Sequence, residues 1–550
     1  MNKLQKFLKC LLNLNRNNFY LIIIIAFYAI TELSIIEWGI PGLTHPFPYH
    51  MDEMHQLEFV RNVFKYGTSD TSGVTQIPIT QFILTGIFLI PFYLTKYINP
   101  GIITSAISAL SEQHKLFVVL RLNTLLFGIG TVMVLAITGS KFFKLNKTLI
   151  VFLFVITPIW LSLSNYFKYD IALAFWITLS IFTLLRLDKN AKIKDYLLTG
   201  VVVGFTVGTK VSAAPLILLL SITGPILSKK IYLKKIIGGY LAFLLTFILI
   251  GVPDVIFRFH NYVFFITRIT TQLSRTRESF NLPTNFLEYI FIHQLPTSFG
   301  FLFFILFIFS VIYLIFKNLY FVTEKKQVDR KEIMLLIGLI LFILILAPLK
   351  LELGGNRILM LLPFLVLITG KTLKDAWTSL RNYKYIVIIF VLLVCSIQFI
   401  QSFSWIYMRY KQSPQQNASN WIKANIKMGT TIGIEDIPVY QLLPDLVLKE
   451  YYNDFYKIRT NNYYKYKIIS SQSKILPPVI IVTNDAIYER YIKRGPKKDL
   501  LRRLNANGYQ KRYTASPDVK LFNYFGTDLD FYISGLLAVP VTISIYESYR

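Results

Sequence analysis

Long apolar runs constrain this chain more than any other feature. The first is FYLIIIIAFYAITELSIIEWGI, at residues 19–40, and the basic residues Lys3, Lys6, Lys9 and Arg16 precede it. A helix needs about 20 apolar residues to span a bilayer, and this run lacks the small-residue cleavage site of a signal peptide. We therefore predict an uncleaved first span whose start lies in the cytoplasm.

Comparable runs recur through most of the chain. Hydrophobic residues make up 54% of the sequence, above the roughly 45–50% of soluble domains, and the mean hydropathy is +0.50. These values predict a polytopic α-helical membrane protein. Its further spans are expected near 117–139, 147–164, 170–187, 196–228, 236–253, 297–316, 333–349, 358–371 and 385–403.

Clusters of Lys and Arg between the runs set the expected orientation, because short basic loops stay in the cytoplasm. All of them face inward if 196–228 is a hairpin of two short helices turning near Lys210, and if 77–94 lies along or dips into the outer leaflet. This gives about eleven transmembrane helices. The net charge of +28 is then a topology signal, and we expect no nucleic acid partner.

The composition becomes polar after residue 403, which predicts two domains. Residues 1–403 form the transmembrane domain, with an outer loop at 41–116, and 404–550 form a small, soluble, extracytoplasmic α/β domain. Its expected elements are helices in NASNWIKANIKMG and NDAIYERYIK and strands in TTIGIED, PPVIIVTND and VTISIY.

The octet YHMDEMHQ, at residues 49–56, lies in the outer loop and begins a predicted amphipathic helix. Asp52 and Glu53 fall in its first turn, where acids stabilise the helix dipole, so a purely structural role is one reading. His50 and His55 are five residues apart and would diverge by about 140° on a helix, unlike the paired histidines of zinc proteases. A divalent hard cation held by Asp52 and a distant carboxylate is compatible with the sequence.

Three other charged residues stand at helix ends on the same side. Asp170 opens the run IALAFWITLSIF, either as a helix cap or as an acid that lines a cavity. Lys210 either extends to the interface or meets an anionic headgroup. Arg357 is either a loop arginine or a two-pronged phosphate ligand.

The order of these motifs resembles the GT-C class of glycosyltransferases. An Asp-Glu pair follows the first span, an apolar helix comes next, then NYFKYDIALAFW, GFTVGTK (204–210) and NRILMLLPFL (356–365). The pattern is similar to protein O-mannosyltransferases and lipid A aminoarabinose transferases. One departure is QIPITQFIL, which stands where the family often has H-P-P-L.

The resemblance implies inverting transfer of a sugar from a polyprenyl-phosphate donor to a hydroxyl of a lipid, glycan or protein acceptor. Asp52 would be the general base and Glu53 the neighbour that orients it. Lys210 and Arg357 would bind the donor phosphate, while Asp170, His50 and His55 would contact the acceptor or support the site. The expected location is the plasma membrane, among membrane lipids, with the site on the extracytoplasmic side.

Other classes remain alternatives at this point. A lipid or glycan transporter or flippase would also have many spans, but transporters tend to show repeated halves, and the sequence has no evident repeat. A glycan polymerase or ligase would share the topology without the Asp-Glu pair.

Overall fold

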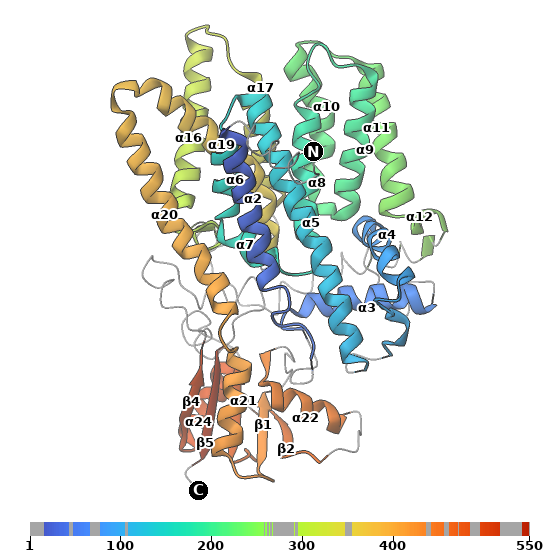
Figure 1. Ribbon diagram of the computed structural model, residues 1–550, viewed down its shortest axis with the longest axis vertical. Coiled ribbons are helices and arrows are strands. Elements are labelled where there is room, and N and C mark those ends of the chain that lie inside the picture. The colour runs from blue at the N-terminus through green and yellow to red at the C-terminus, as the bar shows by residue number, and fades with distance from the viewer. Residues whose placement is uncertain are drawn as a thin grey trace, which may run out of the picture.

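The structure is a computed structural model with a helical bundle at one end and a small α/β domain at the other (Figure 1). It describes residues 16–42, 48–66, 78–104, 108–257, 259–260, 263, 267, 291, 295–346, 355–435, 442–455, 461–470, 472–483, 496–516 and 542–548. The predicted helix NDAIYERYIK lies outside these residues.

The bundle consists of helices that match most of the predicted runs. They are α2 (Arg16–Ser34), α5 (Leu110–Phe143), α6 (Lys147–Val155), α7 (Pro158–Leu163), α8 (Tyr169–Leu184), α9 (Ile193–Thr209), η2 (Val211–Ala213), α10 (Pro215–Ser228), α11 (Leu233–Thr246), η3 (Phe247–Gly251), α12 (Asp254–Phe257), α15 (Leu295–Phe299), α16 (Phe301–Thr323), α17 (Arg330–Leu346), α18 (Gly355–Ile358), η5 (Leu359–Leu361), α19 (Leu362–Ser379), η6 (Arg381–Tyr383) and α20 (Lys384–Arg409).

Five helical segments in the described part are long and apolar enough to cross a membrane, at 110–143, 211–228, 233–251, 301–323 and 384–409. The chain is therefore an integral membrane protein. The count of eleven crossings stays a prediction, since the apolar part of α2, Asn18–Ser34, and α8 are shorter than these segments, and the run 147–164 breaks into α6 and α7 at Thr157.

The predicted hairpin at 196–228 is confirmed, with α9 and α10 joined at Lys210. Glycines let its first helix approach α11 closely. A Cβ added to Gly200 would lie 2.0 Å from the Gly239 carbonyl oxygen, and one added to Gly208 would lie 2.9 Å from the Cα of Gly251. This close approach holds the end of α9 against η3. The last carbonyl of η3, that of Gly251, accepts a hydrogen bond from the backbone N–H of Ile79 at 2.8 Å.

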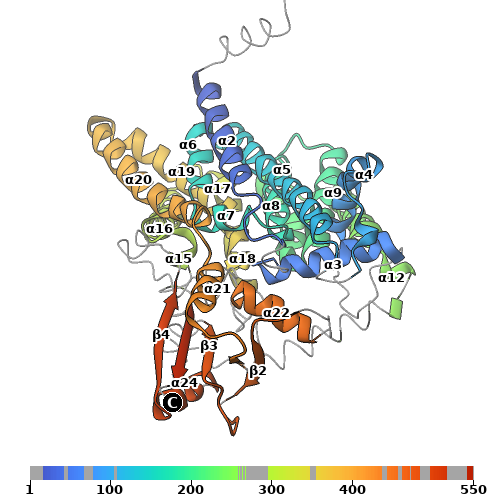
Figure 2. The ribbon, with the colours of Figure 1, turned by 60° about the horizontal axis from the view of Figure 1, so that its bottom comes forward.

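A separate group of helices lies at one side of the bundle, on the right in Figure 2. It contains α3 (Met51–Tyr66), α4 (Thr80–Leu94), η1 (Pro100–Ile102) and the first turns of α5. The predicted apolar face of α3 is confirmed, because Met54, Leu57 and Val60 are buried in a shared core with residues of α4 and α5. With 15 residues, α4 is about 22 Å long, too short for a straight crossing.

The α/β domain contains a five-stranded mixed sheet in the order β2-β1-β3-β5-β4. Strand β1 is parallel to β2 and β3, and β5 is antiparallel to β3 and β4. Three strands were predicted: β1 (Thr431–Glu435), β3 (Val479–Thr483) and β5 (Ile543–Ser548). Those not predicted are β2 (Lys465–Ile469) and β4 (Tyr509–Ala515). The helices are the predicted α21 (Pro414–Asn425), together with α22 (Asp445–Phe455) and α24 (Pro496–Ala506).

Two helix boundaries differ from those expected. Lys168, not Asp170, occupies the N-cap of α8, which places Asp170 inside the first turn. The capping role considered for Asp170 is therefore wrong. The last bundle helix, α20, continues through Arg409, beyond the expected end at residue 403, and leads directly into the cap of α21 at Ser413.

Candidate active site

Glu53 is the best anchored of the predicted site residues. Both of its carboxylate oxygens accept hydrogen bonds from the guanidinium of Arg121, at 3.0 and 2.7 Å, and Oε1 also accepts from the backbone N–H of Phe167 at 2.7 Å. The side chains of Glu53 and Arg121 are 0% and 1% exposed. A carboxylate this fully engaged fixes the first turn of α3 rather than standing open to a substrate.

Arg121 also secures the segment that follows the first span. Its Nη1 donates to the carbonyl oxygens of Ile36 and Trp38, both at 2.7 Å. These two carbonyls lie beyond the last residue of α2, where helical partners end. One buried guanidinium thus ties α2, α3 and α5 together at the base of the predicted site.

Asp52 lies beside this anchor, in the first turn of α3. Its side chain is outside the described part of the structure, so its role as general base stays a prediction. Its backbone position is nonetheless set by the three hydrogen bonds to the adjacent Glu53.

The two histidines of the octet are in different surroundings. His50 is buried and packs edge-to-face on Tyr166, with ring centroids 4.7 Å apart. His55 is 52% exposed, with Nδ1 3.8 Å from a carboxylate oxygen of Glu58. Among the described residues, no group of three His, Cys, Asp or Glu side chains is placed to hold a metal.

Asp170 and Lys210 form an ion pair. The Lys210 ammonium donates to Oδ1 of Asp170 at 2.9 Å, and the Lys168 ammonium lies 3.5 Å from Oδ2. Asp170 is 1% exposed and Lys210 17%, so the lysine retains limited access. The Lys210 ammonium also sits 4.7 Å from the centroid of the Tyr169 ring.

Arg357 carries an unsatisfied polar atom. Its Nη1 is buried and has no hydrogen-bond partner among the described residues. A buried donor without a partner costs about 1–3 kcal/mol, and an anionic ligand would supply the missing acceptor. The segment that begins with Arg357 approaches the end of the α9–α10 turn, because the Ser212 hydroxyl donates to Sδ of Met360 at 3.3 Å.

These contacts connect three of the predicted residues, Glu53, Asp170 and Lys210, and reach the segment that carries Arg357. Glu53 contacts Phe167, which lies just before the N-cap of the helix that carries Asp170; Asp170 pairs with Lys210; and Ser212, just after Lys210, meets Met360. The two histidines lie outside this series of contacts, with His50 packed on Tyr166 and His55 facing Glu58.

Two arginines of this region were not predicted as site residues. Arg121 lies inside an apolar run, which is itself a signal, since a charge within such a run has a buried partner or lines a cavity. Arg409 is buried at the end of α20, donates to the Ser162 carbonyl at 2.7 Å, and lies 5.1 Å from the Tyr166 ring centroid.

A contact with the α/β domain adjoins the octet. The hydroxyl of Tyr49 lies 2.7 Å from Oγ of Ser413, the N-cap of α21, and it is also hydrogen-bonded to Asp445 in the first turn of α22. Burial raises the pKa of Asp445 to about 7, opposed by the bond from Tyr49. We call Tyr49, Ser413 and Asp445 the Tyr49 contact.

The anchored acid, the short helix after it and the lysine at the hairpin turn belong to the motifs on which the GT-C resemblance rests. Comparison with a family model confirms the resemblance: residues 74–269 match "PMT: Dolichyl-phosphate-mannose-protein mannosyltransferase". The matched region contains Asp170 and Lys210 and begins after α3.

Solved structures of ArnT from Cupriavidus metallidurans are also similar to the chain. The apo structure has 12% identity and a TM-score of 0.41, covering 73% of this chain and 71% of that one. The structure bound to undecaprenyl phosphate has 11% identity and a TM-score of 0.44, covering 95% of this chain and 97% of that one. No curated protein matches significantly.

Proposed function

We propose that the protein is a membrane glycosyltransferase that moves a sugar from a polyprenyl-phosphate donor to a hydroxyl acceptor, with inversion, at the outer face of the membrane. The observation that carries this proposal is the mannosyltransferase match over 74–269, within which Asp170 and Lys210 are paired. The undecaprenyl phosphate bound to ArnT is in keeping with a lipid-phosphate donor.

In this proposal, the Asp52 carboxylate takes the proton of the acceptor hydroxyl while that oxygen attacks the anomeric carbon. The new C–O bond forms as the bond between the anomeric carbon and the phosphate oxygen breaks. The electron pair leaves with the polyprenyl phosphate, so the departing group gains negative charge. A positioned base contributes about 10²–10⁴-fold to such a step.

Positive groups are needed where the phosphate leaves. Arg357 offers a buried guanidinium nitrogen that has no hydrogen-bond partner among the described residues. Lys210 is held by Asp170, which fixes the ammonium in place and leaves it partly accessible. Glu53 acts as a positioning residue in this scheme, because its contacts with Arg121 and Phe167 hold the turn that carries Asp52.

The test is transfer of a radiolabelled sugar from polyprenyl-phosphate donors in membranes that contain the protein or its Asp52→Asn variant. We expect transfer by the wild type and a loss of at least a hundredfold in the variant. Equal rates would disprove the role of Asp52. Absence of transfer from any such donor, together with lipid movement between leaflets, would replace the proposal with a transporter.

A further inference from the structure

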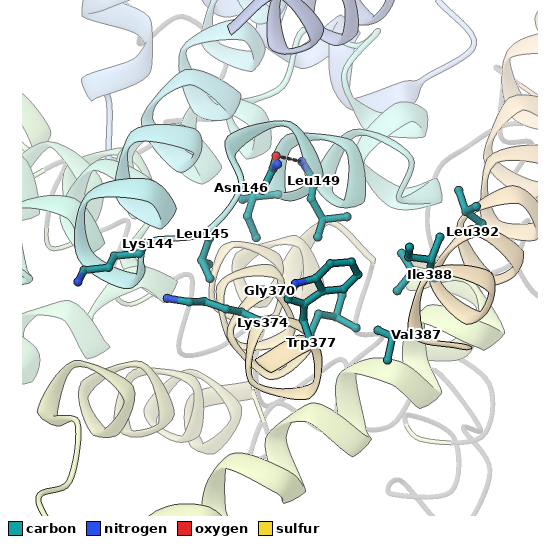
Figure 3. Close-up of a pocket in the computed structure, with 13 residues that line it drawn as sticks. Lys144, Leu145, Asn146, Leu149, Gly370, Lys374, Trp377, Val387, Ile388 and Leu392 are labelled. Atoms are coloured by element: carbon teal, nitrogen blue, oxygen red, sulfur yellow. Dashed lines mark hydrogen bonds between the residues drawn. The ribbon is translucent and has the colours of Figure 1, made fainter. Parts of the chain in front are cut away.

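A cavity of about 440 Å³ (Figure 3) is lined by residues near the end of the bundle that lies away from the α/β domain in Figure 1. Its walls come from the start of α6, the second half of α19 and the first half of α20. The residues used below are Lys144, Asn146, Gly370, Lys374, Trp377 and Ile388.

The length of α5 places this cavity at the opposite membrane boundary from the candidate active site. Arg121, which anchors Glu53, and Lys144, the C-cap of α5, are joined by one continuous helix. Their separation in sequence corresponds to about 35 Å along the axis, close to the roughly 30 Å of a bilayer's hydrocarbon core. The cavity is therefore distinct from the proposed donor site.

One end of the cavity is positively charged. The ammonium ends of Lys144 and Lys374 point to the same side in Figure 3, and Lys374 Nζ donates to the Phe143 carbonyl at 3.0 Å. An ammonium has three donors, so this bond leaves Lys374 able to bind an anion. The neighbouring acid does not neutralise the pair, because Asp375 is engaged by Lys317 at 2.7 Å and Lys371 at 2.6 Å.

The rest of the cavity is apolar. Leucine, isoleucine and valine side chains of α6, α19 and α20 line it, and Gly370 makes room, since a Cβ there would lie 2.1 Å from Cδ1 of Ile150. Trp377, 45% exposed, lies between the lysines and the α20 wall. Tryptophan is enriched at the level of lipid headgroups.

We propose that this cavity binds an anionic glycerophospholipid from the leaflet opposite the candidate active site. The phosphate lies between Lys144 and Lys374, the glycerol region contacts Trp377, and an acyl chain runs along Ile388 and the apolar face of α20. The two lysines and the apolar groove together favour this occupant. A free phosphate would contact the lysines without filling the groove, and a neutral lipid would fill the groove without pairing its charge with the lysines.

The experiment is native mass spectrometry of the full-length protein in detergent, titrated with phosphatidylglycerol or phosphatidylcholine. We expect one phosphatidylglycerol to bind at least tenfold more tightly than phosphatidylcholine. The double variant Lys144→Asn with Lys374→Gln should abolish this preference. Its matched control is Lys189→Gln with Lys194→Gln, which removes two exposed lysines outside the cavity, one from the loop between α8 and α9 and one from the first turn of α9.

Two results would overturn the proposal. One is equal phosphatidylglycerol binding by the wild type and the Lys144/Lys374 variant. The other is an equal loss in the control pair, which would mean that general surface charge attracts the lipid. A third variant, Ile388→Trp, fills the groove without changing the charge. It should weaken binding of the full-length lipid while leaving binding of glycerol phosphate unchanged.

Discussion

Glu53 and Arg121 are 68 residues apart in the sequence and meet through two hydrogen bonds, with both side chains buried. Removing one partner of a buried ion pair leaves the other charge uncompensated and costs about 3–5 kcal/mol. We therefore expect Glu53→Gln to lower the melting temperature in detergent markedly. Arg121→Lys keeps the positive charge but loses the paired N–H donors of the guanidinium, so it should lower the melting temperature by an intermediate amount.

The control for this prediction is Glu58→Gln. Glu58 is about one-third exposed and faces His55 at 3.8 Å, and surface changes of this kind are usually within about 0.5 kcal/mol. If Glu53→Gln melts like Glu58→Gln, the ion pair does not anchor α3.

Asp170 and Lys210 are expected to act as a unit. Singly, Asp170→Asn removes the counter-charge of Lys210, and Lys210→Met leaves Asp170 with Lys168 as its remaining ion-pair partner, so the double variant should lose less stability than the sum of the two single losses. Direct contacts give coupling energies of about 0.5–3 kcal/mol in double-mutant cycles. Denaturation of the four proteins measures this value, and strict additivity would contradict the pairing.

Lys210 and Lys168 should differ in their effect on the donor. Both ammonium groups face Asp170, but only Lys210 is proposed to meet the donor phosphate. We expect Lys210→Met to raise the KM for the polyprenyl-phosphate donor and Lys168→Met to leave it nearly unchanged. Steady-state kinetics would measure both KM values. Equal increases in KM for the two variants would assign both lysines a structural role.

Arg357 should contribute to donor binding through the buried nitrogen that has no hydrogen-bond partner among the described residues. A hydrogen bond to a charged group is worth about 1.5–3 kcal/mol, so Arg357→Gln should weaken inhibition by free polyprenyl phosphate by roughly tenfold to a hundredfold. Arg330→Gln is the matched control, because Arg330 donates to the Ile226 carbonyl in a different part of the bundle. Similar inhibition of both variants would exclude Arg357 from the phosphate site.

The Tyr49 contact should depend on pH. Burial raises the pKa of Asp445 from 3.8 to about 7, so between these values the folded state binds more protons than the unfolded state. The contribution of Asp445 to the free energy of unfolding is therefore fully present below about pH 4 and is lost as the pH rises towards 7. Asp445→Asn should flatten this dependence in melting curves of the full-length protein, and parallel curves for both proteins would refute the assignment.

Much of the fold followed from apolar periodicity. The spacing of Met54, Leu57 and Val60 predicted α3, while the α9–α10 hairpin was predicted by placing the Lys and Arg clusters on the cytoplasmic side. The buried strands β1 and β3 were predicted because apolar residues dominate TIGIE and VIIVT. For α3, β1 and β3 the residues of the element itself were enough to predict it.

What the sequence missed depends on partners that are distant in the chain. KYKII and YQKRYTA read as polar segments because β2 and β4 are the edges of the sheet, where lysine and other polar side chains face solvent. The anchoring role of Glu53 was hidden for the same reason, since Arg121 comes from another helix.

The Tyr49 contact has a consequence for biosynthesis. Tyr49 and Ser413 are 364 residues apart, so the segment beside the octet emerges from the ribosome long before the residues that complete its surroundings. The Tyr49 contact, which adjoins the turn of α3 that carries Asp52, can form only after the α/β domain has been made. A truncated chain that inserts correctly into the membrane would still lack this last assembly step.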